Sequence, residues 1–126
     1  MRYLMIHKLD ESLPEAWNPS PEFIDKMGAF MGEVQASGAL LAAEGVHQSK
    51  EGALIRKDTT GLTVTDGPFT EAREVIGGFA LVEVADKAEA IQLGQRFADL
   101  FPQVSVEVRR VFEEEDFGAV ADSQDA

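Results

Sequence analysis

The sequence contains no cysteine. This absence excludes disulfide frameworks, thiol nucleophiles and cysteine metal ligands together. The sequence also lacks any apolar run near the roughly 18 residues that a membrane span needs, and it shows no secretory signal pattern. We therefore expect a cytoplasmic protein with no membrane partner. Its length of 126 residues predicts one domain with a core of its own.

Basic residues are scarce as well. The chain has 11 lysines and arginines against 23 aspartates and glutamates, for a formal net charge of −12. Nucleic acids and anionic membranes favour surfaces with clustered lysine and arginine. The charge balance therefore argues against a nucleic acid as partner.

Much of the negative charge lies at the C-terminal end. After Phe112 come six acids and no basic residue: Glu113, Glu114, Glu115, Asp116, Asp122 and Asp125. Such a segment has too few apolar side chains to bury, which is typical of a solvated and poorly ordered end. We expect a folded domain over residues 1–112 and a disordered acidic tail over residues 113–126. Phe117 and Val120 leave open a second interpretation, in which the tail docks on a partner subunit.

Motifs for metals and cofactors are absent too. The two histidines, His7 and His47, are far apart and show no spacing typical of metal ligands. The sequence has no glycine-rich phosphate loop and no nucleophile-elbow serine. We therefore expect neither a metal nor a cofactor. His7 lies in an apolar run, and we interpret it as a core or rim histidine rather than a ligand.

The patterns that are present predict two helices and several strands. Ser20 and Pro21 form a helix start, and the apolar stripe that follows has a 3.6-residue period until Gly38. A second helix is expected between Asp86 and Pro102. Apolar runs and period-two alternation predict strands over residues 3–8, 39–46, 53–57, 62–65, 78–84 and 104–109.

This order of elements predicts an α+β fold of the ferredoxin-like, split βαβ type. Its helices would cover one face of a mainly antiparallel sheet and leave the other face bare. Tyr3 and Met5, the alanines and leucines of residues 39–46 and the valines of residues 104–108 indicate that the bare face is apolar. A second copy of the same sheet could cover it. The sequence therefore predicts a two-fold homodimer with its sites near the sheet interface.

The candidate site centres on the turn after residue 65. Leu62 and Val64 alternate with threonines, so continued alternation places Asp66 on their apolar face. A carboxylate in an apolar compartment needs hydrogen bonds or a cation, or else its pKa rises. The alternative interpretation is structural, because aspartate before Gly67 and Pro68 also makes a good turn.

The same residues resemble a known family. The hexapeptide Asp66 to Glu71, followed by Glu74 and by Gly77-Gly78-Phe79, is similar to the signature of the DGPF branch of YCII-related proteins. The segments Ala43 to His47 and Met1 to Met5 resemble the same pattern. The resemblance implies a dimeric α+β barrel. It also implies similarity in fold to small lactone isomerases and cofactor-free monooxygenases.

The resemblance carries over one site residue. Some YCII-related proteins have a histidine and aspartate pair as a proposed active site, with the histidine in the first-helix region. Here residues 21–37 contain no histidine, so Asp66 alone matches through a motif. DGPF-type genes often neighbour extracytoplasmic sigma factors, which implies a regulatory role as the competing function.

Two functions follow from these observations. As an enzyme, the protein would transfer protons on a small aromatic or lactone-like molecule, with Asp66 as base or orienter and His47 as its proton partner. The expected substrate contacts would then come from Glu44, Arg56, Phe69 and Glu71. As a binding protein, it would hold a small-molecule ligand in a homodimer without reaction, and Asp66 would only stabilise the turn.

Overall fold

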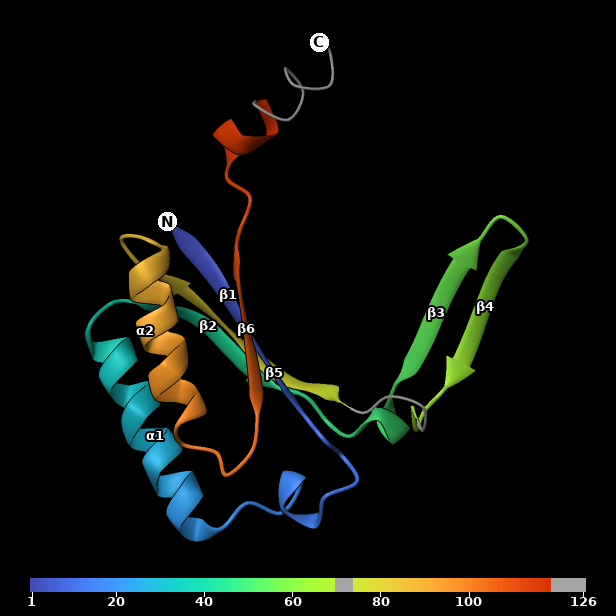
Figure 1. Ribbon diagram of the computed structural model, residues 1–126, viewed down its shortest axis with the longest axis horizontal. Helices are drawn as coiled ribbons and strands as arrows, with labels where there is room; N and C mark the ends of the chain where they lie inside the picture. Colours follow the sequence, from blue (N-terminus) through green and yellow to red (C-terminus); the bar gives the residue numbers. More distant parts are fainter. Residues whose placement is uncertain (70–73, 119–126) are drawn as a thin grey trace.

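The computed structural model describes residues 1–69 and 74–118. Its elements follow the expected order along the chain (Figure 1). They are β1 (Arg2–Leu9), the 3-10 helix η1 (Pro14–Ala16), α1 (Pro21–Ala36), β2 (Leu40–Gly45), the 3-10 helix η2 (Ser49–Glu51), β3 (Ala53–Asp58), β4 (Gly61–Asp66), β5 (Val75–Glu83), α2 (Lys87–Ala98) and β6 (Ser105–Arg110).

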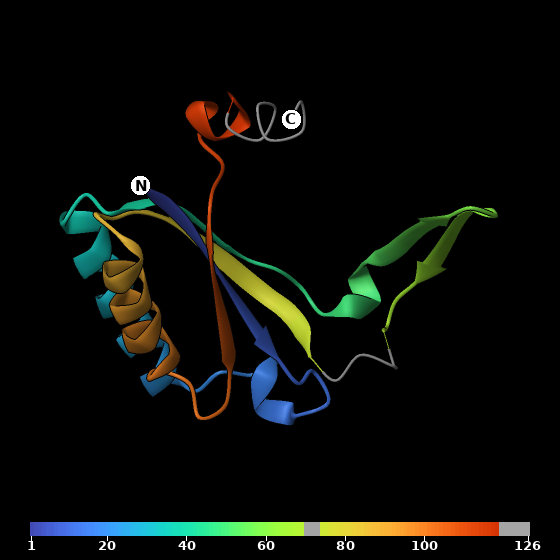
Figure 2. The same cartoon turned by 45° about the horizontal axis from the view of Figure 1, so that its top comes forward.

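Four strands form one antiparallel sheet in the order β2-β5-β1-β6. Helices α1 and α2 lie together on one face of this sheet (Figures 1 and 2). The central pair β1 and β5 is flanked by the strand that follows α1 and the strand that follows α2. This arrangement confirms the ferredoxin-like α+β fold.

Both long helices begin where their capping residues predict. The Phe23 backbone N–H donates to Oγ of Ser20 over 3.1 Å, and Pro21 occupies the first turn, where a missing N–H costs nothing. The Glu89 backbone N–H donates to Oδ1 of Asp86 over 2.9 Å at the start of α2. Gly38 follows α1 with a φ of +81°, a left-handed conformation that favours glycine.

The core fills the space between the sheet and the helices. Alternate residues of β1 and β5 supply its centre, where Tyr3 and Met5 lie opposite Val82 and Ala80. A second group of buried side chains, Phe30, Val34 and Phe97, joins α1 to α2. The helices therefore cover the side of β1 that carries Tyr3 and Met5, and the expectation that these two residues lie on the bare face of the sheet is wrong.

The intervening residues of the same strands form the other side of the sheet. Leu4 lies opposite Leu81, and Ile6 lies opposite Phe79. All four side chains are half-buried, and no described helix covers them. We call this surface, defined by these four residues, the open face. It is apolar, as expected, but through other residues than expected, because Tyr3, Met5 and the β6 valines Val106 and Val108 lie on the helix side.

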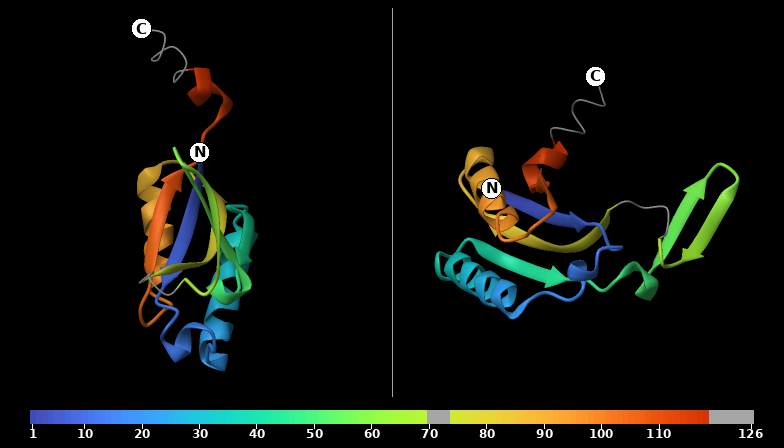
Figure 3. Two further views of the ribbon diagram at one scale, coloured as in Figure 1. Left: turned by 90° about the vertical axis from the view of Figure 1, so that its right-hand side faces the viewer. Right: turned by 60° about the horizontal axis from the view of Figure 1, so that its bottom comes forward.

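Strands β3 and β4 form a separate two-stranded hairpin. The hairpin projects from the sheet on the side away from the helices, and the right-hand view of Figure 3 shows it apart from the sheet. We call this hairpin, residues 53–66, the arm. Three consecutive strand-like runs, over residues 39–46, 53–57 and 62–65, predict a meander. This prediction is wrong in one respect: β2 pairs with β5, and not with β3.

The C-terminal end is anchored where it leaves the sheet. Nε of Arg2 donates to Oε1 of Glu113 over 3.1 Å, and this bond holds the pKa of the Glu113 carboxyl below its ordinary value. Residues 114–118 are helical, and Phe117 stacks on Phe112 with ring centroids 4.9 Å apart. The sequence predicts a disordered tail over residues 113–126; its first part, residues 113–118, is anchored and partly helical, and residues 119–126, Val120 among them, lie outside the described residues.

Candidate functional site

A cavity of about 660 Å³ lies on the helix side of the sheet, at the end where β1 stops. Its walls come from the start of α1, the end of α2 and the loop that joins β1 to α1. Most of the lining is apolar, with the largest side chains being Trp17, Phe23, Met27, Met31, Phe97 and Phe101. Both this volume and this lining are typical of pockets that bind small organic molecules.

One imidazole lies in this apolar wall. His7 is on the same side of β1 as Met5 and lies opposite Gly78 in β5. Its ring packs against Phe97 and Phe101, with centroids 5.4 Å from each. His7 is therefore a rim histidine of the core, as the sequence predicts, and it also lines the cavity.

Two glycines make room for the imidazole. A β-carbon at Gly77 would lie 2.6 Å from Nε2 of His7, and one at Gly78 would lie 2.7 Å from Cε1. Such distances are too short for any side chain, so both positions require glycine while His7 keeps this rotamer. The Gly77-Gly78 pair therefore positions the cavity's imidazole.

The surroundings of His7 keep its ring neutral. Burial lowers the pKa of His7 below its ordinary value because an imidazolium would lose hydration in the apolar wall. Within the described part of the chain the ring makes no hydrogen bond, and neither ring nitrogen is sealed from solvent. A neutral imidazole has one N–H donor and one acceptor nitrogen. His7 can therefore offer both to a ligand.

The loop between β1 and α1 closes one side of the cavity. Nε1 of Trp17 donates to the Glu11 carbonyl over 3.2 Å, which fixes the indole in the wall. Oδ1 of Asp10 accepts from the backbone N–H and Oγ of Ser12 over 2.9 and 2.6 Å, and these bonds lower the pKa of Asp10. Trp17 is half-buried in this wall.

Ser49 joins this loop to the turn after β4. The Glu11 carboxylate accepts from the backbone N–H of Ser49 over 3.0 Å and from its hydroxyl. The Ser49 hydroxyl in turn accepts from the backbone N–H of Phe69 over 2.8 Å. Gly67 packs against the Ser49 carbonyl so closely that a β-carbon at position 67 would collide with it. The turn that the sequence singles out is therefore an anchor for the cavity loop.

The expected catalytic pair lies elsewhere. Asp66 ends β4 opposite Ala53 at the base of the arm, and it shares a face with Leu62 and Val64, as alternation predicts. All three side chains are exposed, so one chain does not supply the apolar compartment expected around Asp66. The reason is that the arm projects away from the core. His47 is exposed as well, and no hydrogen bond between described residues joins it to Asp66.

The expected substrate contacts are dispersed. Residues 43–45 line the cavity, but Glu44 lies opposite Phe79, so its side chain is on the open face. Arg56 is exposed on the arm, and Phe69 is half-buried beside Gly52. Glu71 lies outside the described residues. Of the three described positions, Glu44 alone belongs to the cavity wall.

Sequence reasoning did not identify His7 as a site residue. One signal was available: alternation places His7 on the core side of β1 with Tyr3 and Met5, where a histidine is unusual. The glycine pair at positions 77 and 78 indicates a place where another group approaches the strand closely. What joins these signals is the register between β1 and β5, which the structure supplies.

The sequence itself matches a known protein family. A model of the YCII-related domain matches residues 1–115. The chain belongs to the YCII-related domain family. The chain is also similar to an uncharacterized protein of Rhizobium meliloti (strain 1021), with 27% identity over 112 residues that cover 86% of this chain and 90% of that protein.

Membrane spans and metal sites can be assessed in the described part of this YCII-related chain, residues 1–69 and 74–118. No helix among the described residues is both long enough and apolar enough to cross a membrane. Within the same residues, no group of three histidine or carboxylate side chains is placed to hold a metal ion.

Proposed function

We propose that this YCII-related protein binds a small, mainly apolar organic molecule in the cavity beside His7. One observation carries the proposal: a cavity of about 660 Å³, lined by aromatic and methionine side chains, contains an imidazole whose ring nitrogens have no partner among the described residues. An aromatic ligand would pack against Phe97, Phe101 and Trp17. A polar group on the ligand would bond to His7.

The charge of the wall favours a neutral or cationic ligand. Asp10 is in the described lining, which contains no lysine or arginine. An anion there would meet one carboxylate and lose its hydration without gaining a cation. Arg56, the one arginine among the expected substrate contacts, is on the arm instead. A neutral aromatic molecule or an aromatic amine therefore fits better than an acid.

Proton transfer without a cofactor is the reaction that this site supports. A neutral His7 can accept a proton from an acidic O–H or C–H of the ligand and return it to a second atom. The lowered pKa of His7 keeps the acceptor form present at neutral pH. In this proposal His7 takes the place first expected for His47, whereas catalysis by Asp66 and His47 would need a neighbouring molecule to bring them together.

A second function has its own support. No described carboxylate bonds to His7, although catalytic histidines are commonly oriented by such a partner. The same cavity could therefore hold a ligand without reaction, as a regulatory binding protein would, including one that acts with a sigma factor. The hexapeptide supports placement in the DGPF branch, and the open face supports a homodimer in which a second copy covers it.

Matched ligands and matched variants test the binding site. The thermal unfolding midpoint would be measured with 2-naphthalenemethanol, 2-naphthylmethylamine and 2-naphthoate, which differ mainly in charge. Binding to the folded state raises the midpoint. We expect shifts with the neutral and cationic compounds, smaller shifts for His7→Asn, and wild-type shifts for the matched change His47→Asn.

Each alternative gives a different pattern in this experiment. Equal shifts for wild type and His7→Asn would contradict the role of His7. A loss confined to His47→Asn and Asp66→Asn would return the site to the expected pair. Turnover is then examined by exchange of ligand protons with deuterated water, and no exchange by the bound ligand would favour the non-catalytic function.

A further inference from the structure

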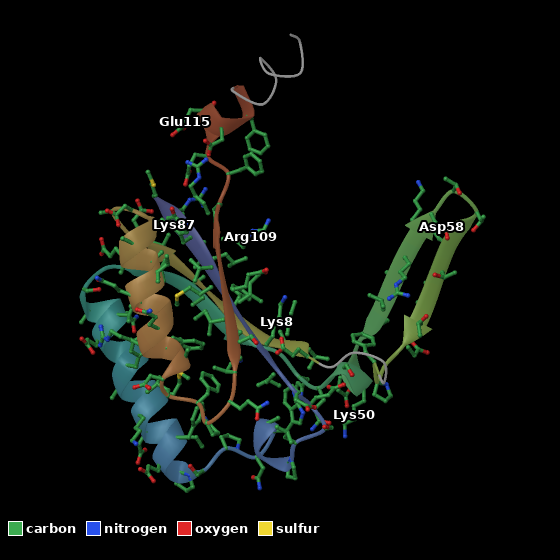
Figure 4. All side chains as sticks on the ribbon, viewed as in Figure 1. Lys8, Lys50, Asp58, Lys87, Arg109 and Glu115 are labelled. Carbon is green, nitrogen blue, oxygen red and sulfur yellow. The ribbon has the colours of Figure 1, made fainter. Side chains whose placement is uncertain are left out.

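The arm buries almost nothing in its own chain. Strands β3 and β4 pair with each other, and every residue of both strands is exposed. Figure 4 labels Lys50 near the base of the arm and Asp58 at its tip, and the sheet lies well away from both strands. An isolated two-stranded hairpin is only marginally stable in water. A well-formed arm therefore indicates a packing partner.

The arm has one apolar face and one polar face. Ile55 lies opposite Val64, and these two share a side with Ala53 and Leu62 and, at its two ends, with the charged residues Asp66 and Lys57. Leu54 and Arg56 lie on the other side with Thr63 and Thr65. Ile55, Leu62 and Val64 are 66%, 67% and 65% exposed. Alternation of this kind is typical of strands with one buried face, but in the described chain nothing covers the apolar face of the arm.

The open face is the second uncovered apolar surface. Figures 1 and 2 show the helices on one side of the sheet and the arm on the other. A molecule bound to the open face, residues Leu4, Ile6, Phe79 and Leu81, would therefore lie next to the arm. Each copy has one open face and one arm. In a two-fold dimer, the arm of each copy can therefore cover the open face of the other, so that the same contact occurs twice.

Charge also favours a second copy as the occupant. The arm, residues 53–66, carries Arg56 and Lys57 against Asp58 and Asp66, for a net charge of zero in a chain of −12. The neutral arm can therefore approach a second, acidic copy of the chain without net electrostatic repulsion.

The margin of the open face, formed by Lys8 of β1 and by Glu107 and Arg109 of β6, carries cationic side chains that the arm can contact. Lys8 and Arg109 both lie 3.9 Å from the single carboxylate of Glu107. Arg109 lies opposite Leu4, and Figure 4 shows its side chain on the side away from the helices. This margin thus has one more cation than anion. Asp66, on the apolar face of the arm, is the matching anion.

We propose that the apolar face of each arm packs on the open face of a second copy, with Asp66 beside the partner subunit's Arg109. The proposal rests on the homodimer proposed above and adds the element that holds it. Asp66 then gains the apolar surroundings and the cationic partner that one chain does not supply.

Paired variants on the two faces of one strand test the role of the arm. Val64→Asp places a charge on the apolar face, and Thr63→Asp places the same charge on the polar face. Both positions are exposed in the single chain, so circular dichroism should show both variants folded. By sedimentation equilibrium we expect the wild type to be a dimer. Val64→Asp should raise the dimer dissociation constant at least about tenfold, and Thr63→Asp less than about threefold.

Cross-linking tests where the arm docks. The chain has no native cysteine, so an introduced cysteine is its only thiol and the cross-linker has no other cysteine to react with. Val64→Cys protein and differently tagged Leu81→Cys protein are mixed and treated with a short bismaleimide, so that each mixed product joins two copies. We expect a strong product with Val64→Cys and a weak one with Thr63→Cys.

Three results would overturn the proposal. A wild type that stays monomeric at about 100 µM, a concentration that favours even weak dimers, would remove both the dimer and the arm contact. A dimer that survives Val64→Asp would overturn the arm contact and leave the homodimer standing. Equal cross-linking by the two arm variants would place the arm elsewhere on the partner.

Discussion

The imidazole of His7 occupies its place because residue 77 is glycine. A β-carbon at Gly77 would lie 2.6 Å from Nε2 of His7 and 3.1 Å from Cδ2 of Leu9. Gly77 is buried in the sheet, so neither neighbour moves without disturbing the cavity wall. This contact between β5 and β1 is the most specific feature of the candidate site.

Gly77→Ala is therefore expected to lower the free energy of unfolding by about 1–3 kcal/mol, the cost of overpacking a core. Urea unfolding measures the change. The double variant His7→Ala with Gly77→Ala should recover part of the loss, because the colliding ring is gone. Gly28→Ala in α1 is the control: its β-carbon would meet nothing within 4 Å, and a helix favours alanine. Equal costs with and without the imidazole would show that the two residues do not collide.

Ser49→Ala should loosen the loop that carries Trp17. The change removes the hydroxyl that bonds to Glu11 and accepts from Phe69, in a residue that is only 7% exposed. Leaving these groups unpaired costs about 1–3 kcal/mol. We expect that loss in urea unfolding, together with faster acrylamide quenching of Trp17, the single tryptophan of the chain.

Ser12→Ala is the matched control for Ser49→Ala. Ser12 is in the same loop and bonds to Asp10, but it is exposed. Its removal should change stability by less than about 1 kcal/mol and leave Trp17 quenching unchanged. Similar effects of the two serine variants would mean that the Ser49 bonds do not hold the cavity loop.

The stability of the folded protein should depend on His7 below pH 6.5. Burial lowers the folded-state pKa of His7, so between this pKa and the ordinary value the unfolded state binds more protons. Stability should therefore fall as pH drops through this window. The decrease should be smaller in His7→Phe, which does not titrate.

Urea unfolding at pH 7.5 and pH 5 checks this prediction for both proteins. The titration of His7 can also be followed directly by NMR, because His47→Asn leaves a single histidine in the chain. A midpoint at or above 6.5 would contradict the described burial.

Local patterns predicted the secondary structure well and the site poorly. Capping residues and alternation placed both helices and the shared face of Leu62, Val64 and Asp66, but not the buried side of β1. Strand β5 begins at Val75, earlier than predicted, because it continues to pair with Lys8 and Leu9 at the end of β1. Such pairing between distant segments leaves no local signal.

The site depends on the same kind of long-range contact. Alternation shows which face of a strand is apolar but not what covers it. It therefore does not distinguish an arm that leaves the sheet from strands that belong to the sheet. The cavity joins His7 to Phe97 and to Trp17, residues far apart in sequence. No spacing rule connects them.

The most direct measurement of the binding site is an NMR titration with 2-naphthalenemethanol, or with the related compound that stabilises the protein most. The indole N–H of Trp17 gives one signal, and the two imidazoles are told apart with His7→Asn and His47→Asn. We predict that the ligand shifts the signals of Trp17 and His7 at one common dissociation constant and leaves those of His47 and Asp66 unchanged. Shifts confined to His47 and Asp66 would contradict the cavity as the binding site.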